Sequence, residues 1–256
     1  MKGVIIVPST ETTDWVPKAM PGISPMELPI AGKRYIDYAI EYAEKKGYEM
    51  VEVLDWCFSE RLAAEFEDLA GSSIPVFYQK GVGERPRTVD NLARQSSPLT
   101  QDLGENITVS WGLELANLHI RSITDWYRAN MAILYMAEKN GSLLTLPGYS
   151  DEGGIYRGSN VVIEQGCELK RPVLLQDNVW CAKNTLLDGF CIVGRESFIS
   201  ESVRLKRAVI GDDTFIGFGL DLVDKMVFGK RVIDVRTETW VDIDEPGVVR
   251  KLHHEF

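Results

Sequence analysis

The chain has 256 residues, 45% of them hydrophobic, and a formal net charge of −10. A chain of this length can bury one large core or two modest ones. The acidic balance and the lack of a basic stripe argue against a nucleic-acid partner, because phosphate backbones are bound by clustered Lys and Arg. The N-terminus lacks a signal-peptide layout, and no apolar run reaches the roughly 18 residues of a membrane span. We therefore expect a cytoplasmic protein with no membrane partner.

The four cysteines are expected to be packing thiols. Cys57, Cys167, Cys181 and Cys191 have no CxxC spacing and no neighbouring histidine, so we expect no bound metal. Unpaired thiols are typical of a reducing compartment, and buried cysteines behave as small apolar side chains.

The first 83 residues alternate between short apolar strands and amphipathic helices. We expect, in chain order, a strand at 2–7, a helix at 33–46, a strand at 49–54, a helix at 59–69 and a strand at 74–78. Gly47 follows the first helix as its stop signal. Strands that alternate with helices of this length predict a parallel sheet with right-handed crossovers.

The next part of the chain is less regular. Residues 84–116 contain RPRT, QSSP and QDLGEN, whose weak periodicity and frequent breakers predict irregular structure. The later stretch SITDWYRANMAILYMAEKNG predicts one helix with Thr124 as the N-cap and Gly141 as the stop. The expected apolar face of this helix consists of Ile123, Tyr127, Met131, Leu134 and Tyr135.

From residue 163 onward an apolar residue recurs every six positions. The series is Ile163, Leu169, Leu175, Cys181, Leu187, Val193, Ile199 and Leu205, and after a step of five it continues with Ile210 and Ile216. Four positions after each of the first members comes a small or β-branched residue, as at Val173, Thr185 and Ser197. A period of six is typical of a solenoid whose flat faces are short strands joined by tight turns. Eleven hexads over 155–220 would make three to four three-faced coils; a sandwich of short strands is the alternative.

Several stretches of the chain resemble the sugar-1-phosphate nucleotidyltransferase family. LPIAGKRYIDY at 28–38 resembles the family segment LPIAGKPLIDY, and DWYRAN at 125–130 resembles its DYLxAN element. VFYQKGVG at 76–83 is similar to the stretch near the family's base pocket, and the hexads resemble the left-handed β-helix that often follows the domain.

The resemblance implies an α/β fold in two parts. We expect a shortened doubly wound, Rossmann-like nucleotidyltransferase-type domain over 1–140 and a left-handed parallel β-helix of hexapeptide repeats over 150–235. A C-terminal strand and tail would occupy 236–256. The left-handed sense comes from the resemblance, because repeat spacing carries no information about handedness.

The loop after the first strand departs from the family pattern. Family members have a glycine-rich loop, GxGTRL, whose backbone N–H groups and arginine hold a triphosphate, whereas this chain has PSTETTDW at 8–15. No glycine is available there, and a Cβ atom blocks the close approach of backbone to phosphate. Glu11 and Asp14 would also repel a triphosphate unless a metal ion intervened.

Other parts of the family's catalytic machinery are missing as well. Pro25 stands where the family has its signature lysine. The stretch between Gly83 and Leu118 is too short for the section with the metal-binding aspartate and the sugar pocket. Because nucleotidyl transfer depends on positioning and charge neutralisation around the phosphates, we expect impaired catalysis. The cofactor stays open, with Mg²⁺ implied only if nucleotidyl transfer is retained.

Nine residues are candidates for ligand binding, and none is assigned a catalytic role. They are Ser9, Thr10, Thr12, Thr13, Lys18, Lys33, Asp55, Gln79 and Gly83. The hydroxyls could donate to a sugar or phosphate, or simply form an exposed polar loop. Lys18 could replace the missing lysine in space, and Lys33 stands at the family's GKP position. Asp55 follows a strand, at the sheet edge where open α/β sheets bind ligands, or it is a helix-entry residue.

Three functions remain open. The main interpretation is a nucleotidyltransferase-like protein of sugar-nucleotide metabolism that is catalytically impaired and acts by binding, regulation or scaffolding, with a sugar phosphate or nucleotide as ligand. The first alternative is an active sugar-1-phosphate nucleotidyltransferase with an unusual loop. The second is a hexapeptide-repeat acyltransferase, which would need a histidine as general base. The histidines are His119, His253 and His254, and none lies within the hexads.

Aromatic residues in the hexads suggest self-association. Trp180, Phe190 and Phe198 fall at outward or corner positions. Exposed aromatic side chains on a flat β face mark a subunit interface more often than a ligand platform. We therefore expect a homo-oligomer that forms through the β-helix.

Overall fold

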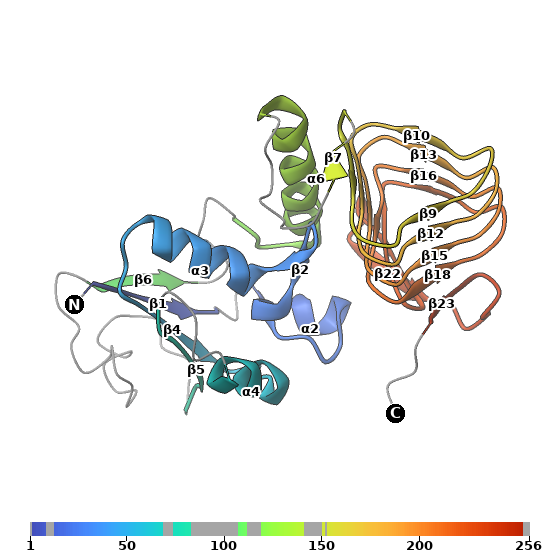
Figure 1. Ribbon diagram of the computed structural model, residues 1–256. Helices are drawn as coiled ribbons and strands as arrows, with labels where there is room; N and C mark the ends of the chain where they lie inside the picture. Colours follow the sequence, from blue (N-terminus) through green and yellow to red (C-terminus); the bar gives the residue numbers. More distant parts are fainter. Residues whose placement is uncertain are drawn as a thin grey trace. The chain divides into compact units, whose positions relative to one another are not determined.

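The computed structural model describes residues 2–8, 13–68, 74–82, 107–111, 119–140, 150–151 and 153–252. Their contacts divide the chain into two compact units, Met1–Asp125 and Trp126–Phe256, drawn in Figure 1. The division falls within helix α6 (Ile123–Asn140), whereas the sequence-based boundary lies between residues 140 and 150. Among the described helices, none combines the length and the apolar character that crossing a membrane requires.

The first unit is built on a four-stranded parallel sheet with the strand order β5-β4-β1-β6. Its strands are β1 (Gly3–Val7), β4 (Met50–Asp55), β5 (Val76–Lys80) and β6 (Ile107–Trp111). All five residues of β1 are buried, so this central strand is a continuous apolar run without alternation. The three strands expected in the first 83 residues are confirmed, each shifted by no more than two residues.

Strand β6 shows that the prediction of irregular structure throughout 84–116 is wrong. Residues 107–111, ITVSW, pair in parallel with β1 over its whole length. A run of five residues with alternating polarity is too short to be recognised as a strand between segments rich in Gly, Pro and Asn. Their strand conformation depends on pairing with a distant segment, which periodicity does not reveal.

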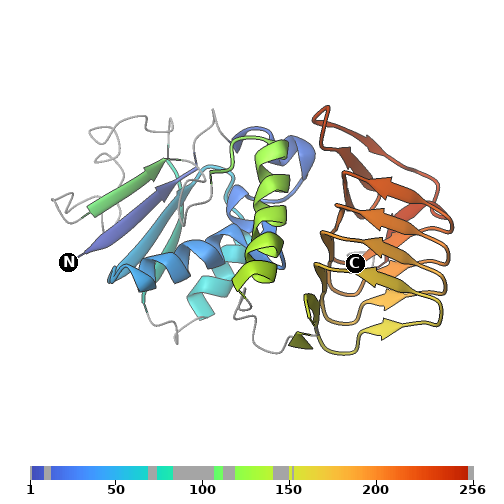
Figure 2. The same cartoon turned by 90° about the horizontal axis from the view of Figure 1, so that it is seen from above.

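Helices connect the parallel strands. Between β1 and β4 the chain forms α2 (Val16–Ala19), the short helix η1 (Pro25–Glu27), the hairpin strands β2 (Pro29–Ile30) and β3 (Lys33–Arg34), and α3 (Tyr35–Lys45). α4 (Glu60–Asp68) connects β4 to β5. The hairpin turns at Ala31 and Gly32, both at positive φ, so α3 begins two residues later than expected. Both crossovers run in the same direction across the sheet, which puts α3 and α4 on one face (Figure 2).

The second unit is a three-faced solenoid of short parallel strands, as the hexads predict. The first face contains β8 (Ile155–Arg157), β11 (Val173–Leu175), β14 (Cys191–Val193), β17 (Val209–Ile210) and β20 (Lys225–Phe228). The second contains β9 (Val162–Ile163), β12 (Trp180–Cys181), β15 (Phe198–Ile199) and β18 (Thr214–Ile216). The third contains β10 (Glu168–Lys170), β13 (Leu186–Asp188), β16 (Arg204–Lys206) and β19 (Asp221–Val223). After four coils β20 begins a fifth, so the stack is longer than predicted.

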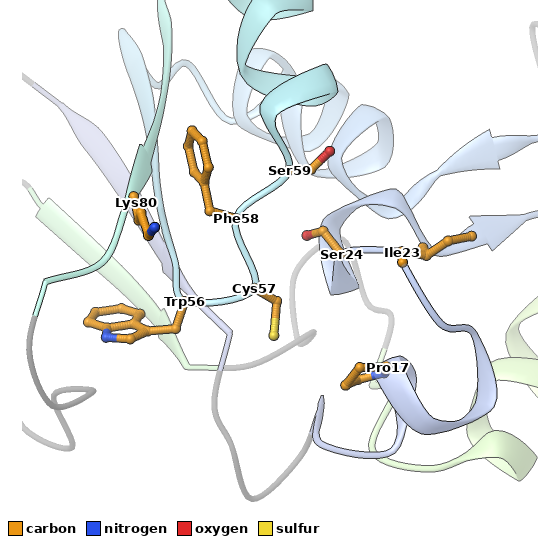
Figure 3. A pocket seen from close by; sticks show the side chains of 9 residues that line it. Pro17, Ile23, Ser24, Trp56, Cys57, Phe58, Ser59 and Lys80 are labelled. Carbon is orange, nitrogen blue, oxygen red and sulfur yellow. The ribbon is translucent and has the colours of Figure 1, made fainter. Parts of the chain in front are cut away.

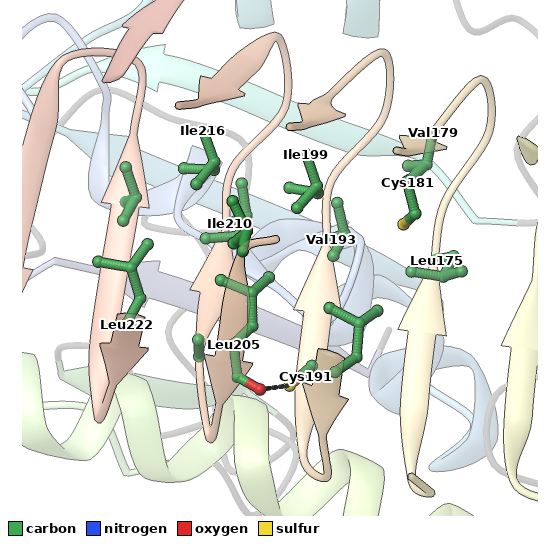
Figure 4. Packing of buried hydrophobic residues seen from close by; sticks show 14 of the residues in the cluster. Leu175, Val179, Cys181, Cys191, Val193, Ile199, Leu205, Ile210, Ile216 and Leu222 are labelled. Atoms are coloured by element: carbon green, nitrogen blue, oxygen red, sulfur yellow. Dashed lines mark hydrogen bonds between the residues drawn. The ribbon is translucent and has the colours of Figure 1, made fainter. Parts of the chain in front are cut away.

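The six-residue period sets the stacking. Leu175 pairs with Val193, and Val193 pairs with Ile210, so each inward residue lies on the one three hexads further along. The series forms one buried core, in which Cys181, Leu187 and Ile199 have no exposed surface (Figure 4). The pattern therefore places one large apolar side chain per strand inside the coil.

The smaller second set fills the remaining core volume and satisfies its own polar atoms. The Thr185 hydroxyl donates to the Ala182 carbonyl at 2.7 Å, and the Ser197 hydroxyl donates to the Gly211 carbonyl at 2.9 Å. The Cys191 thiol donates to the Leu205 carbonyl at 3.4 Å (Figure 4), and burial raises its pKa to about 12. Cys191 is therefore a packing thiol, as expected.

Helix α6 differs in detail from its prediction. The Ser122 hydroxyl accepts the Asp125 N–H at 3.2 Å, so the cap lies at Ser122 and the expected cap at Thr124 is wrong. The buried positions are Ile123, Trp126, Ala129, Asn130, Ile133 and Leu134, whereas the Tyr135 side chain, expected inside, is 51% exposed. The face is rotated because Trp126 stacks on Phe228 with ring centroids 5.0 Å apart.

Antiparallel strands end the solenoid. β21 (Arg231–Asp234) and β22 (Thr239–Asp242) extend the first face beyond β20, β7 (Ser150–Asp151) pairs with β8 at its other edge, and β23 (Val249–Lys251) pairs with β18. The segment 236–256 thus contains two strands among its described residues, where one was expected.

Truncation of an inward leucine should destabilise the solenoid. Leu187 is fully buried, so we expect Leu187→Ala to lower the free energy of unfolding by about 2–5 kcal/mol. Its neighbour Leu186 is partly exposed and lies on the opposite face of the strand, so Leu186→Ala should cost about 1 kcal/mol or less. Urea unfolding of both variants measures the difference. Equal losses would contradict the inward assignment of the hexad series.

Candidate ligand-binding site

A cavity of about 320 Å³ lies at the carboxyl edge of the parallel sheet (Figure 3). Trp56 and Cys57 follow β4, and Lys80 ends β5, so this edge of the sheet supplies one wall. The lining residues are Pro17, Gly22, Ile23, Ser24, Trp56, Cys57, Phe58, Ser59 and Lys80. Parallel strands present their carboxyl ends at one edge, where open α/β sheets bind ligands.

The buried carboxylate of Asp55 lies directly behind this cavity. Asp55 has no exposed surface. Its Oδ2 accepts hydrogen bonds from the Ser24 hydroxyl at 2.5 Å and the Tyr78 hydroxyl at 2.9 Å, and its Oδ1 accepts the Cys57 N–H at 2.8 Å. A buried carboxylate needs such donors, because desolvation is otherwise costly. Asp55 therefore fixes two loops that line the cavity, one through Ser24 and the other through Cys57.

A second buried carboxylate closes the same network. Glu27 accepts the Ser24 N–H at 3.0 Å and the Ser59 hydroxyl at 3.2 Å, and Arg61 donates to it at 2.8 Å. The Ser59 N–H in turn donates to the Tyr78 hydroxyl at 3.0 Å. Burial and then the charge of Asp55 raise the pKa of Tyr78, so its phenol stays protonated and donates to the carboxylate.

The cavity wall combines aromatic rings with a helix start. A Cβ atom at Gly81 would come within 2.3 Å of the Trp56 indole, so the missing side chain lets the ring lie against the backbone. Phe58 stacks on Tyr78 with ring centroids 5.1 Å apart. The Ser59 hydroxyl accepts the Leu62 N–H at 3.2 Å and caps α4.

The cations near the sheet edge differ in their pairing. Lys33 forms an ion pair with Glu41, and Arg34 binds Asp37 and Glu65 with N–O distances of 2.8 and 2.6 Å. Lys80 is exposed, and its ammonium has no hydrogen bond or ion pair with any residue within the described ranges. Lys80 is thus the one cationic side chain among those lining residues that the structure describes.

The residues proposed from sequence as ligand-binding candidates differ in their position relative to the cavity. Asp55 lies beside the cavity but does not line it, and Lys18 is exposed on α2, next to the lining residue Pro17. Thr13 is buried, with 1% of its surface exposed. Gln79 follows Tyr78 in strand β5, where successive side chains point to opposite faces. The Gln79 side chain therefore lies on the sheet face opposite Tyr78.

The other proposed residues lie away from the cavity or outside the described residues. Lys33 belongs to the hairpin strand β3. Ser9, Thr10, Thr12 and Gly83 lie outside the described residues. Sequence reasoning missed Ser24, Cys57 and Lys80, although the last two stand at or just after the end of a strand, which is the signal that selected Asp55.

The remaining groups singled out from sequence are the histidines and the aromatic residues of the hexads. His119 is exposed before α6, and His253 and His254 lie outside the described residues. The Trp180 ring lies tilted against Phe198, and Phe198 stacks on Phe215, with centroids 6.0 and 5.8 Å apart. Phe190 is a half-buried corner residue at positive φ. Phe198 and Phe215 therefore cover each other's ring faces, whereas Trp180 remains 42% exposed.

A curated relative matches part of the chain. The UTP–glucose-1-phosphate uridylyltransferase of Synechocystis sp. is 26% identical over 125 residues, which are 48% of this chain and 31% of that protein. The chain thus spans less than a third of the length of this relative. No protein-family model matches the chain.

Two solved structures of one protein also align with the chain. The acetyltransferase domain of PglB from Neisseria gonorrhoeae FA1090 has a TM-score of 0.25 and 13% identity, with 90% of this chain and 97% of that chain covered. Its complex with acetyl coenzyme A has a TM-score of 0.22 and 14% identity, with 89% and 96% covered. TM-scores of this size do not establish a shared fold.

Removal of the Tyr78 hydroxyl should loosen the loop that lines the cavity. Tyr78→Phe deprives Asp55 of a donor and the Ser59 N–H of its acceptor, so we expect a loss of about 1–3 kcal/mol in unfolding free energy. Hydrogen exchange of the Ser59 amide should accelerate correspondingly. Tyr42→Phe is the matched control, because the Tyr42 hydroxyl has no hydrogen bond to a described residue. An unchanged Ser59 exchange rate would show that Tyr78 does not hold this loop.

Proposed function

We propose that this chain is a sugar-1-phosphate nucleotidyltransferase-like protein of sugar-nucleotide metabolism that no longer transfers nucleotides efficiently. It acts by binding a sugar phosphate or nucleotide, and through that binding it regulates or scaffolds other steps. The cavity at the carboxyl edge of the first sheet is its ligand site. A homo-oligomer that forms through the solenoid, wound as a left-handed β-helix, belongs to the same proposal.

The distribution of positive charge is the observation that carries this function. Nucleotidyl transfer requires that several phosphate charges be neutralised at once. Lys33, which matches the family's LPIAGK segment, and its neighbour Arg34 are held by carboxylates of their own unit. Lys80 is the single cation that lines the cavity among the described residues. One lysine is sufficient to attract a phosphate group but not to neutralise a reacting triphosphate.

The sheet order and the curated relative support the domain assignment. In the order β5-β4-β1-β6, strands β4 and β5 follow one another on one side of β1, and β6 lies on its other side. One half of a doubly wound sheet has the same arrangement. The Synechocystis relative is named for uridylyl transfer between UTP and glucose 1-phosphate. We take UTP and glucose 1-phosphate as the first compounds to test.

The decisive experiment measures binding and turnover on the same sample. With UTP, glucose 1-phosphate and Mg²⁺ present, we expect no pyrophosphate release above background, because the described lining of the cavity offers a single cation, Lys80. Calorimetry should nevertheless detect binding of glucose 1-phosphate or a uridine nucleotide.

Two outcomes would favour the alternatives. Enzymatic pyrophosphate release would establish an active transferase and contradict impaired catalysis. Binding of acetyl-CoA that His119→Ala abolishes would favour the acyltransferase, with His119 as its general base.

A further inference from the structure

We propose that two copies of this chain dimerise through the second face of the solenoid, with their coils stacked in opposite order. This inference rests on the proposed function, because it assigns the homo-oligomer to one face and one symmetry. The two-fold axis runs parallel to the strands and passes beside Phe198 in β15, the middle strand of this five-stranded face (Figure 1).

The outward side chains of the second face form an apolar row. Val162, Trp180, Phe198 and Phe215 occupy paired positions on four successive coils. Val162 and Trp180 are 39% and 42% exposed, and Phe218, at the corner after β18, is 71% exposed. Large apolar side chains that are contiguous at a surface are typical of a protein–protein contact.

The outward positions of the other two faces differ from this row. On the first face Leu174 and Ile192 are buried, and Trp126 of α6 stacks on a ring of β20. On the third face Arg204 and Asp221 pair with each other at 3.2 Å, so its outward side is charged. Within the described solenoid, the second face is therefore the one that offers an apolar and exposed row to a partner.

The two ends of the apolar row carry opposite charges. Glu164 follows Val162 at the first coil and accepts the Trp180 indole N–H at 2.9 Å. Arg250 pairs with Phe215 at the last coil, and its guanidinium lies 4.7 Å from the centroid of that ring. Neither charged group forms an ion pair with a residue in the described ranges. The face is thus negative at one end, apolar in the middle and positive at the other end.

This charge distribution favours opposite coil order. About the two-fold axis Phe198 faces its own counterpart, Trp180 faces Phe215 of the second copy, and Glu164 comes opposite Arg250 of the second copy at both ends. A parallel arrangement, including a three-membered ring, would instead bring like charges to the same level. Because like charges across an interface are costly and unlike charges fix its register, we infer an isologous dimer.

The corner beside the row supports the same register. Lys183 and Glu201 are exposed at this corner on neighbouring coils, and the Ser202 N–H donates to the Lys183 carbonyl at 3.0 Å. Opposite coil order brings the two Glu201 side chains near the axis. It also places Lys183 of each copy diagonally across from Glu201 of the other, which offsets their repulsion.

A charge swap in the full chain tests the dimer. Glu164→Arg and Arg250→Glu each put like charges opposite one another, so each should weaken dimerisation about 10-fold or more. The double variant restores unlike charges and should regain most of the affinity. Sedimentation equilibrium measures the dimerisation constants, and circular dichroism confirms that each variant is folded.

Matched controls come from the rest of the solenoid. Glu168 is exposed on the third face and has no ion pair with a described residue, so Glu168→Arg should leave the dimerisation constant unchanged. Trp180→Glu should abolish the dimer because it places a charge within the apolar row. Trp240→Glu alters another exposed tryptophan, on strand β22 of the first face, and should not affect dimerisation.

The outcomes separate this inference from the proposed function. A trimer, or a dimer that the single charge variants do not weaken, overturns the assigned face but leaves a homo-oligomer in place. A double variant that stays as weak as the single ones overturns the opposite coil order. A monomeric natural protein overturns the dimer and the homo-oligomer together. Calorimetry and pyrophosphate release on the same sample then decide separately whether ligand binding with impaired catalysis stands.

Discussion

The architecture of the first unit depends on how one buried carboxylate is satisfied. Asp55 ends the β4 strand without access to water and must find its donors inside the protein. It finds them in a residue before η1, in the loop after β4 and in β5. These three segments are thereby held around one point, and the cavity is the space they leave at the sheet edge. The same carboxylate that forms the site is for this reason unsuited to contact a ligand.

Sequence periodicity predicted the solenoid more completely than the sheet. Each hexad carries its own inward residue, so local pattern and global packing coincide, as at Leu187 and Ile199. The smaller second set, which includes Thr185 and Ser197, was also identified from the sequence. In the structure their hydroxyls form hydrogen bonds within the coil. Strand β6 was missed because its partner is β1, about a hundred residues earlier, and no local signal encodes that pairing.

The site was predicted in place but not in composition. Asp55 was selected because it follows a strand, and it proved to lie behind the cavity that Lys80 lines. Which of two neighbouring residues faces a ligand is decided by strand register and by hydrogen bonds such as that from Tyr78, neither of which a single sequence displays. Lys33 matched a family position, yet its charge is used by Glu41 within the same unit. A residue can therefore match a family motif in sequence and still be engaged by an ion pair within the protein.

The single five-residue step between Leu205 and Ile210 affects how the solenoid can vary in length. It spans the corner at Arg207, where the backbone is at positive φ, and the strands on both sides remain in register. Loss of one residue is thus absorbed at a corner, whereas the same loss within a strand would turn inward side chains to solvent. Insertions and deletions in related chains should accordingly fall at corners or remove whole coils, which leaves the first unit and its cavity unaffected.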